Sequence, residues 1–239
     1  MRDTSQIANY DAIIAAGDYR VETKLVVNGV TYYEEDLKSI ATSSALFSDV
    51  PSVGNCYSAE IDILMVVPSV IIPPMAELKP YVRLVGATLT SEWIPQGVFY
   101  IDTREQSGEN SYMPLIAIHG YDAMLMAESV YPEDDPENYP MVDTDVVDFI
   151  AEAIGVEVDD RTYDIMTDGY EINLPATYTM REVLSYIGSM YAGNWCMSAE
   201  GKLRLVGLTD IGIETNYLID EHGDAIVFGT GDDATYIIV

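Results

Sequence analysis

Apolar and polar side chains alternate residue by residue over residues 20–27, and this stretch ends at Asn28-Gly29. Successive side chains of a β-strand point to opposite faces, so this alternation indicates a strand with one buried face. Asn-Gly favours a two-residue hairpin turn, which makes residues 30–33 the returning strand. The sequence therefore predicts an antiparallel hairpin near the start of the chain.

Further strand patterns follow this hairpin, and turn-rich stretches separate them. They cover residues 57–67, 81–85, 97–104 and 113–119. Residues 71–74, Ile-Ile-Pro-Pro, are predicted to be a loop or an edge crossing, because proline lacks the N–H group that an interior strand needs. Short strands at this spacing predict an antiparallel barrel or sandwich over residues 19–129, preceded by an N-terminal arm of residues 1–18.

The pattern changes after residue 120. Residues 121–129 predict a short helix, and residues 130–140 predict an acidic, proline-rich linker that resists regular structure. We place the domain boundary at this linker.

Two helices and a hairpin are predicted beyond the linker. The first helix opens at Asp143 or Thr144 and ends at Gly155; the second has a capping box made by Thr179 and Glu182 and ends with Gly193 at its C′ position. A hairpin over residues 194–206 completes a small α/β domain of residues 141–208. The chain is therefore predicted to be an α+β protein.

The C-terminal segment, residues 209–239, contains two more strand patterns, at 224–228 and 234–239. The last of them ends the chain on apolar residues, whereas natural termini are more often polar. We expect either a piece of a longer protein, in which this segment starts a second barrel, or a strand that completes the sheet of a neighbouring subunit.

The charge of the chain excludes several partners. Forty acidic residues against 11 basic residues give a formal net charge of −29. Such a surface repels phosphate, so specific nucleic-acid binding and docking on an anionic membrane are not expected. No apolar stretch is long enough for a signal peptide or a membrane span, so no membrane insertion is expected.

The two cysteines, Cys56 and Cys196, fit no metal-binding or redox spacing, and we interpret them as buried free thiols in a reducing compartment rather than as a disulfide. Cys56 with His119 is the sharpest candidate for a nucleophile and its base. Each of these two residues lies beside a predicted strand, so a structural role is the favoured interpretation. No catalytic, cofactor-binding or metal-binding residue is predicted.

Carboxylates are abundant, and their adjacency therefore carries little information. Pairs that could serve a glycosidase occur at Glu34-Glu35-Asp36, Asp159-Asp160 and Asp232-Asp233. The acidic loop of Glu133, Asp134, Asp135 and Glu137 could hold a hard cation such as Ca²⁺, but a solvated loop is the favoured alternative. The 18 tyrosines suit exposed contact surfaces for protein or carbohydrate.

Two composite patterns indicate a family. Trp93-x-Pro95-x-Gly97 stands between two predicted strands, and Gly120-Tyr121-Asp122-Ala123 follows another. Together with the segments 63–65, 74–83, 91–104, 118–125, 178–184, 190–195 and 200–203, they resemble the N-terminal half of baseplate-hub proteins from the tails of long-tailed bacteriophages and prophages.

This resemblance implies a β-barrel hub domain followed by an α/β domain, assembled as a homotrimer that connects the tail tube to the tail tip. Its partners would be further copies of this chain, the adjacent tube and distal tail proteins, and the tip or spike. It carries over no catalytic residue and implies a virion tail protein assembled in the cytoplasm of the bacterial host. An acidic lumen would suit a ring through which DNA passes without binding.

Two alternatives remain at this point. The chain could be the N-terminal part of a tail-associated cell-wall hydrolase or endopeptidase, or it could be a carbohydrate- or receptor-binding module that uses its tyrosines. The structural, non-enzymatic tail protein is our leading prediction.

Overall fold

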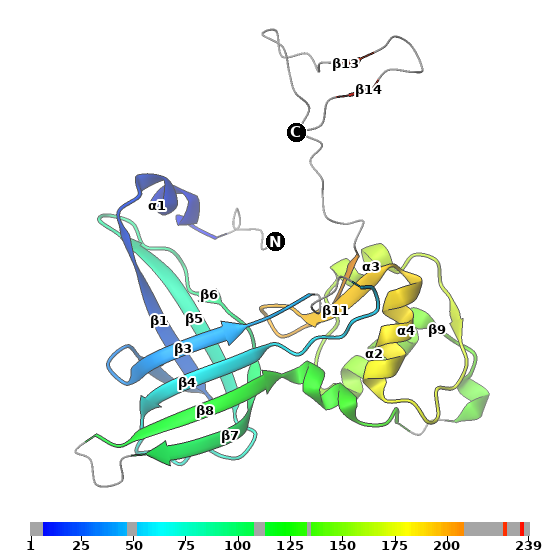
Figure 1. Cartoon of the computed structure of the whole chain (residues 1–239), viewed down its shortest axis with the longest axis horizontal. Helices are drawn as coiled ribbons and strands as arrows, with labels where there is room; N and C mark the ends of the chain where they lie inside the picture. Colours follow the sequence, from blue (N-terminus) through cyan, green and yellow to red (C-terminus); the bar gives the residue numbers. More distant parts are fainter. Residues whose placement is uncertain are drawn as a thin grey trace.

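The computed structural model describes residues 7–46, 52–107, 113–132 and 135–207, together with the backbone of two short strands, β13 (Val227–Phe228) and β14 (Thr235–Tyr236). Two parts are visible in Figure 1, a large antiparallel sheet and a smaller α/β part. The predicted α+β class is confirmed. No helix among these residues is long and apolar enough to cross a membrane.

The order of the strands in the sheet is β2-β1-β5-β7-β8-β4-β3, with β6 paired to β5. Their bounds are β1 (Tyr19–Val27), β2 (Val30–Tyr33), β3 (Leu37–Ser43), β4 (Glu60–Val66), β5 (Glu77–Gly86), β6 (Ile94–Pro95), β7 (Phe99–Ser107) and β8 (Leu115–Asp122). The predicted hairpin is confirmed, because Val27 pairs with Val30 across Asn28 and Gly29. A short helix, α1 (Tyr10–Ala16), lies within the predicted arm and packs on β5.

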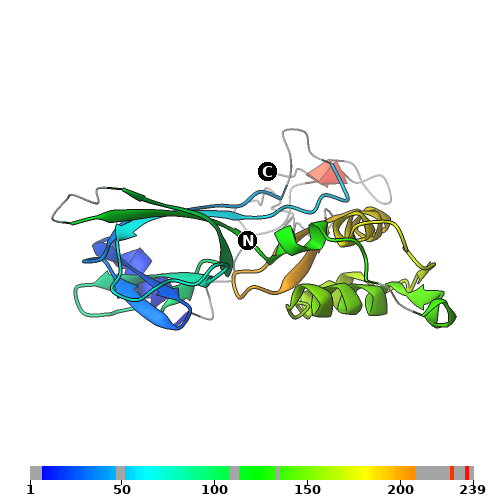
Figure 2. The ribbon, with the colours of Figure 1, turned by 90° about the horizontal axis from the view of Figure 1, so that it is seen from below.

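The predicted barrel is wrong, because the sheet does not close. Its outermost strands, β2 and β3, do not pair with each other. Strands β5 and β7 share only two residue pairs, Glu77 with Tyr100 and Leu78 with Phe99, so the sheet turns a corner there. Figure 2 shows the two resulting layers. Closing a barrel requires hydrogen bonding all the way round, and here the two layers meet through side chains instead.

The core of this part lies between the two layers. Alternation places Leu25 and Val27 of β1 inside, opposite Ile61, Ile63 and other residues of the second layer, as the two-residue period requires. The fully buried large side chains of this core are Leu25, Ile61, Met65, Leu78, Phe99 and Ile118.

Close packing across the sheet predicts a steric effect at Gly120 of β8. A Cβ atom on Gly120 would lie 2.5 Å from the carbonyl oxygen of Tyr100, a backbone atom that cannot move aside cheaply. We expect Gly120→Ala to lower the free energy of unfolding by about 1–3 kcal/mol, the usual range for overpacking. Urea denaturation measures this change. Gly86→Ala is the matched control, because its nearest atom would lie at an ordinary 3.5 Å. Equal effects of the two substitutions would contradict the packing described here.

The second part contains helices, short 3₁₀ turns and short strands. In chain order they are η1 (Ala123–Glu128), η2 (Pro136–Asn138), β9 (Met141–Val142), α2 (Asp143–Ile154), α3 (Arg161–Ile165), β10 (Glu171–Ile172), α4 (Met180–Met190), β11 (Gly193–Met197) and β12 (Leu203–Gly207). Helix α2 ends at Gly155 in the left-handed conformation, as predicted. The predicted capping box of Thr179 and Glu182 is confirmed at the start of α4. Gly193, predicted as a helix cap, is instead the first residue of β11.

A second hydrophobic core holds this part together. Val146, Val147 and Ile150 of α2 and Leu184 of α4 are fully buried around Trp195 of β11. The indole Nε1–H of Trp195 donates to the carbonyl oxygen of Leu184 at 2.6 Å. A buried indole needs such a partner, so this bond fixes the hairpin against α4.

The strands β13 and β14 pair antiparallel, Val227 with Tyr236 and Phe228 with Thr235. They fall within the two strand patterns predicted for the C-terminal segment. The rest of residues 208–239 lies outside the described part of the chain.

Candidate functional site

The structure gives Cys56 and His119 different partners. The Cys56 thiol lies 3.5 Å from the carbonyl oxygen of Arg181, whereas His119 lies on β8 with its Nδ1 2.9 Å from Asp62. Burial raises the pKa of the Cys56 thiol to about 12. A nucleophilic cysteine needs the opposite shift, because the thiolate is the reactive form. The surroundings of Cys56 are therefore those of a structural cysteine and not those of a nucleophile.

Cys196 is also a free thiol, and burial raises its pKa to about 11. The prediction of two free thiols is confirmed. For both thiols burial outweighs the charges of the neighbouring arginines, so neither has the lowered pKa of a reactive cysteine.

Three of the candidate carboxylates that the structure describes, those of Glu34, Asp159 and Asp135, have local partners. The Glu34 carboxylate accepts a hydrogen bond from the Thr23 amide at 3.2 Å. Asp159 forms an ion pair with Arg161, and hydrogen bonding from Arg161 lowers the pKa of Asp159. In the acidic loop, the Asp135 carboxylate accepts a hydrogen bond from the backbone amide of Glu137 at the start of η2. Glu133, Asp134 and the Asp232-Asp233 pair lie outside the described residues. Within the described ranges, no three His, Cys, Asp or Glu side chains are grouped so that they could hold a metal ion.

The junction between the two parts centres on Asp122, the last residue of β8. Its side chain is only 3% exposed. One carboxylate oxygen accepts a hydrogen bond from the backbone amide of Ala59 at 2.8 Å, and the other accepts one from the amide of Met124 at 3.0 Å. Burial raises the pKa of Asp122 to about 6, while these hydrogen bonds oppose that shift. The carboxylate therefore caps η1 and holds the start of β4 at once.

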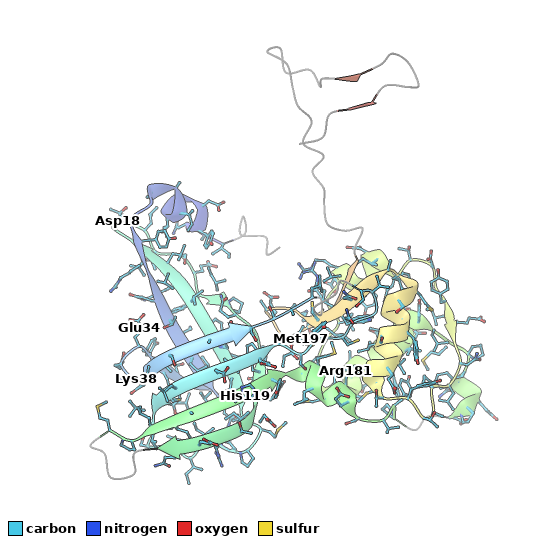
Figure 3. The ribbon with its side chains drawn as sticks, viewed as in Figure 1. Asp18, Glu34, Lys38, His119, Arg181 and Met197 are labelled. Carbon is cyan, nitrogen blue, oxygen red and sulfur yellow. The ribbon has the colours of Figure 1, made fainter. Side chains whose placement is uncertain are left out.

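Arg181 of α4 completes this junction, and Figure 3 labels it. One guanidinium nitrogen lies 2.7 Å from Glu128. Another donates to the Ser58 hydroxyl and to the Met124 carbonyl, both at 3.2 Å. Arg181 thus joins α4 to η1 and to the segment that leads into β4.

The connection between β3 and β4 also pairs with the α/β part. The Trp195 amide donates to the carbonyl of Asn55 at 2.7 Å, and the Tyr57 amide donates to the carbonyl of Trp195 at 3.2 Å. Cys56 and Trp195 form a parallel bridge between these bonds. This backbone pairing fixes the orientation of the two parts more firmly than the η1 connection alone would.

At the other end of the sheet lies a strand edge that pairs with none of the described strands. Strand β1 pairs with β5 over residues 19–27 but with β2 only over residues 24–27. The amide of Thr23 points away from β5, because it bonds to Glu34. Backbone direction repeats every two residues, so the N–H groups of Val21 and Tyr19 point the same way. Val21 is 51% exposed and Tyr19 is 41% exposed, so this edge is open to a partner strand.

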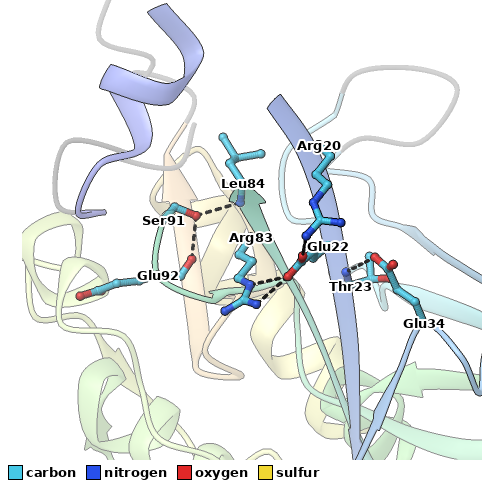
Figure 4. A network of polar contacts seen from close by, with 8 residues as sticks. All are labelled: Arg20, Glu22, Thr23, Glu34, Arg83, Leu84, Ser91 and Glu92. Carbon is cyan, nitrogen blue, oxygen red and sulfur yellow. Dashed lines mark hydrogen bonds and ion pairs between the residues drawn. The ribbon is translucent and has the colours of Figure 1, made fainter. Parts of the chain in front are cut away.

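A polar network stiffens this edge from one face (Figure 4). Glu22 of β1 accepts two bonds from Arg83 of β5, at 2.6 and 2.8 Å, and also pairs with Arg20. The bonds from Arg83 lower the pKa of Glu22. The charged groups of Lys24 and Arg83 both lie over the ring of Trp93, at 4.5 and 4.4 Å from its centre. The open edge is therefore a rigid one.

The opposite edge, β3, is partly protected. Its pairing with β4 is irregular between Leu37 and Ser39, and the bulge carries Lys38. Bulges and lysines are the usual devices that keep an edge strand from pairing indiscriminately. The open half of β1 is the more available edge.

Comparison with known proteins identifies the fold. No protein-family model and no curated protein matches the sequence. The crystal structure of the 43 kDa tail protein of prophage MuSo2 from Shewanella oneidensis matches with a TM-score of 0.50 and 15% identity, over 77% of this chain and 52% of that one. A tail protein from Neisseria meningitidis gives 0.48 at 12% identity, over 77% and 50%. The prophage tail protein gp18 from Listeria monocytogenes gives 0.47 at 6% identity, over 84% and 55%.

The chain thus has the fold found in a solved prophage tail protein and spans about half the length of each of these proteins. At 15% identity the first match shows the fold alone. The activity and the partners of this chain are therefore matters for proposal.

Proposed function

We propose that this chain is a structural component of a bacteriophage or prophage tail, of the baseplate-hub kind, and that three copies form a ring connecting the tail tube to the tail tip. The observation that carries this proposal is the fold shared over 77% of the chain with the 43 kDa tail protein. The role is structural: the chain binds its own copies and adjacent tail proteins and catalyses no reaction.

The open half of β1 supplies a means of assembly. Its amide and carbonyl groups at Tyr19 and Val21, which on this side pair with no described strand, are available to an extended segment of the next copy. A contact between two different surfaces of one protein is heterologous, and heterologous contacts close into rings when the rotation fits. The net charge of −29 per chain would then line part of the central channel. Its repulsion of DNA would extend over a Debye length of about 8 Å in physiological salt.

Electron microscopy of the purified full chain tests this proposal. We expect rings with threefold symmetry and a central channel. Single particles of one chain at every concentration would contradict the ring.

Val21→Pro separates assembly from folding. The amide that proline removes points away from β5, so the pairing of β1 with β5 survives. We expect a normal circular dichroism spectrum but at least about tenfold weaker self-association. One inter-chain hydrogen bond is lost, and the pyrrolidine ring of the proline obstructs the approach of a partner strand. Val21→Ala keeps the amide and is the matched control. Proline and alanine variants that associate equally would show that this edge is not used.

A further inference from the structure

The exposed side of α4 carries features that neither the fold nor the proposed ring requires. Tyr186 is 57% exposed and Tyr178, just before the helix, is 45% exposed. Their ring centres lie 5.5 Å apart, and the rings are nearly perpendicular, at 81°. Two exposed aromatic rings held against each other form a corner with apolar walls.

A polar groove of about 350 Å³ adjoins this corner. Thr179, next to Tyr178, and Ser185, next to Tyr186, both line it, as do Arg181 and Glu128. Glu182 lines it too and lies one helical turn before Tyr186, so the two side chains share a face of α4. The groove and the aromatic corner thus belong to one surface.

Several polar groups in the groove have capacity for a ligand. Glu182 uses only its Oε2 atom in the capping box, which leaves Oε1 without a hydrogen bond to any described residue. The Ser185 hydroxyl likewise donates to no described residue, and the Ser189 hydroxyl donates to the Ser185 backbone carbonyl instead. Carboxylate and hydroxyl oxygens of this kind pair well with vicinal hydroxyl groups of a ligand.

We propose that this surface binds a neutral saccharide, with a pyranose ring packed on Tyr186 and its hydroxyl groups bonded in the groove. A pyranose has an apolar C–H face that suits an exposed aromatic ring, and a rim of hydroxyls that suits Glu182 and Ser185. The groove has two negative charges, on Glu128 and Glu182, against the one positive charge of Arg181, so its net charge is negative. Together with the net charge of −29, this excludes phosphate- or uronate-rich glycans. The proposal does not depend on the ring.

Titration of the full chain with soluble chitohexaose, maltohexaose and cellohexaose, followed by NMR, tests the site, and polygalacturonate serves as the anionic probe. We expect saturable binding of at least one neutral hexasaccharide, with shifts concentrated at Tyr178–Ser189, and none of polygalacturonate. Tyr186→Ala should weaken binding about tenfold, and Tyr178→Ala should weaken it measurably.

Tyr163→Ala is the control, because Tyr163 is another exposed tyrosine, on α3. Binding of no neutral hexasaccharide would overturn the proposal, as would equal binding of polygalacturonate. Shifts of the wild-type chain that fall mainly outside Tyr178–Ser189 would also overturn it, and this result does not depend on whether a variant folds. Equal loss of binding in the Tyr163 and Tyr186 variants would do the same.

Discussion

Trp195→Ala is expected to lower the free energy of unfolding of the α/β part by about 3–5 kcal/mol, the range for removing a large buried aromatic side chain. Trp195 is fully buried among α2, α4 and η1, and it makes the Nε1–H bond to Leu184. Truncation leaves a cavity in the second core and removes this hydrogen bond between β11 and α4. Urea denaturation followed by far-UV circular dichroism measures the loss.

Trp93→Ala is the matched control for this prediction. Trp93 is only half-buried on the outer face of the sheet, where it contacts Lys24 and Arg83. Its loss should cost about 1 kcal/mol, the scale of a cation–π contact at a partly exposed site. Equal costs for the two tryptophans would contradict the assignment of Trp195 to the centre of the second core.

Asp122→Asn is expected to remove a pH dependence of stability at the junction. The folded pKa of Asp122, about 6, lies above its ordinary value of 3.8. The folded state therefore holds this proton more tightly than the unfolded state, and the stability it contributes is complete below pH 4 and lost as the pH rises through 6. The full difference amounts to about 3 kcal/mol. The asparagine variant has no such titration, although it leaves one amide of Ala59 or Met124 poorly bonded.

The measurement is the difference in unfolding free energy between wild type and variant at pH 4, 5, 6 and 7. We expect the wild type to lose stability relative to Asp122→Asn over this range. Asp102→Asn, at an exposed position of β7, is the matched control. A difference for Asp122→Asn that does not change with pH would mean that its carboxylate is hydrated, contrary to the junction described here.

The sequence predicted most of the sheet because alternation is a local signal. Strands β1, β2, β4, β5, β7 and β8 all overlap predicted strands, and β1, β4, β7 and β8 each place two or more apolar side chains in the core. Strand β3 was missed: Lys38, Ser39, Thr42 and Ser43 are exposed, so this edge strand has no apolar row. Edge strands are held by backbone bonds to one neighbour, which composition does not reveal.

The open form of the sheet could not be predicted in the same way. Barrel closure depends on whether β2 meets β3, and that depends on the corner between β5 and β7. The corner depends on the pairing register of β5 and β7, which is set by packing between the two layers. These two strands would show the same alternation of apolar and polar residues in an open sheet and in a closed barrel.

The hydrogen bonds at the junction likewise could not be predicted from the sequence. Ala59, which donates to Asp122, is 63 residues away in the chain, and Ser58 is 123 residues from Arg181. One signal was present: an aspartate between a strand and a helix is a typical N-cap, and Asp122 has that position. Its second bond, to the start of β4, depends on the tertiary fold.

The mass of the full chain in solution, measured by light scattering over a range of concentrations, tests the central claim most directly. We expect a species of three times the 26.4 kDa of one chain, and Val21→Pro should shift its assembly to concentrations at least about tenfold higher, whereas Val21→Ala should not. A mass of 26.4 kDa at every concentration would contradict it.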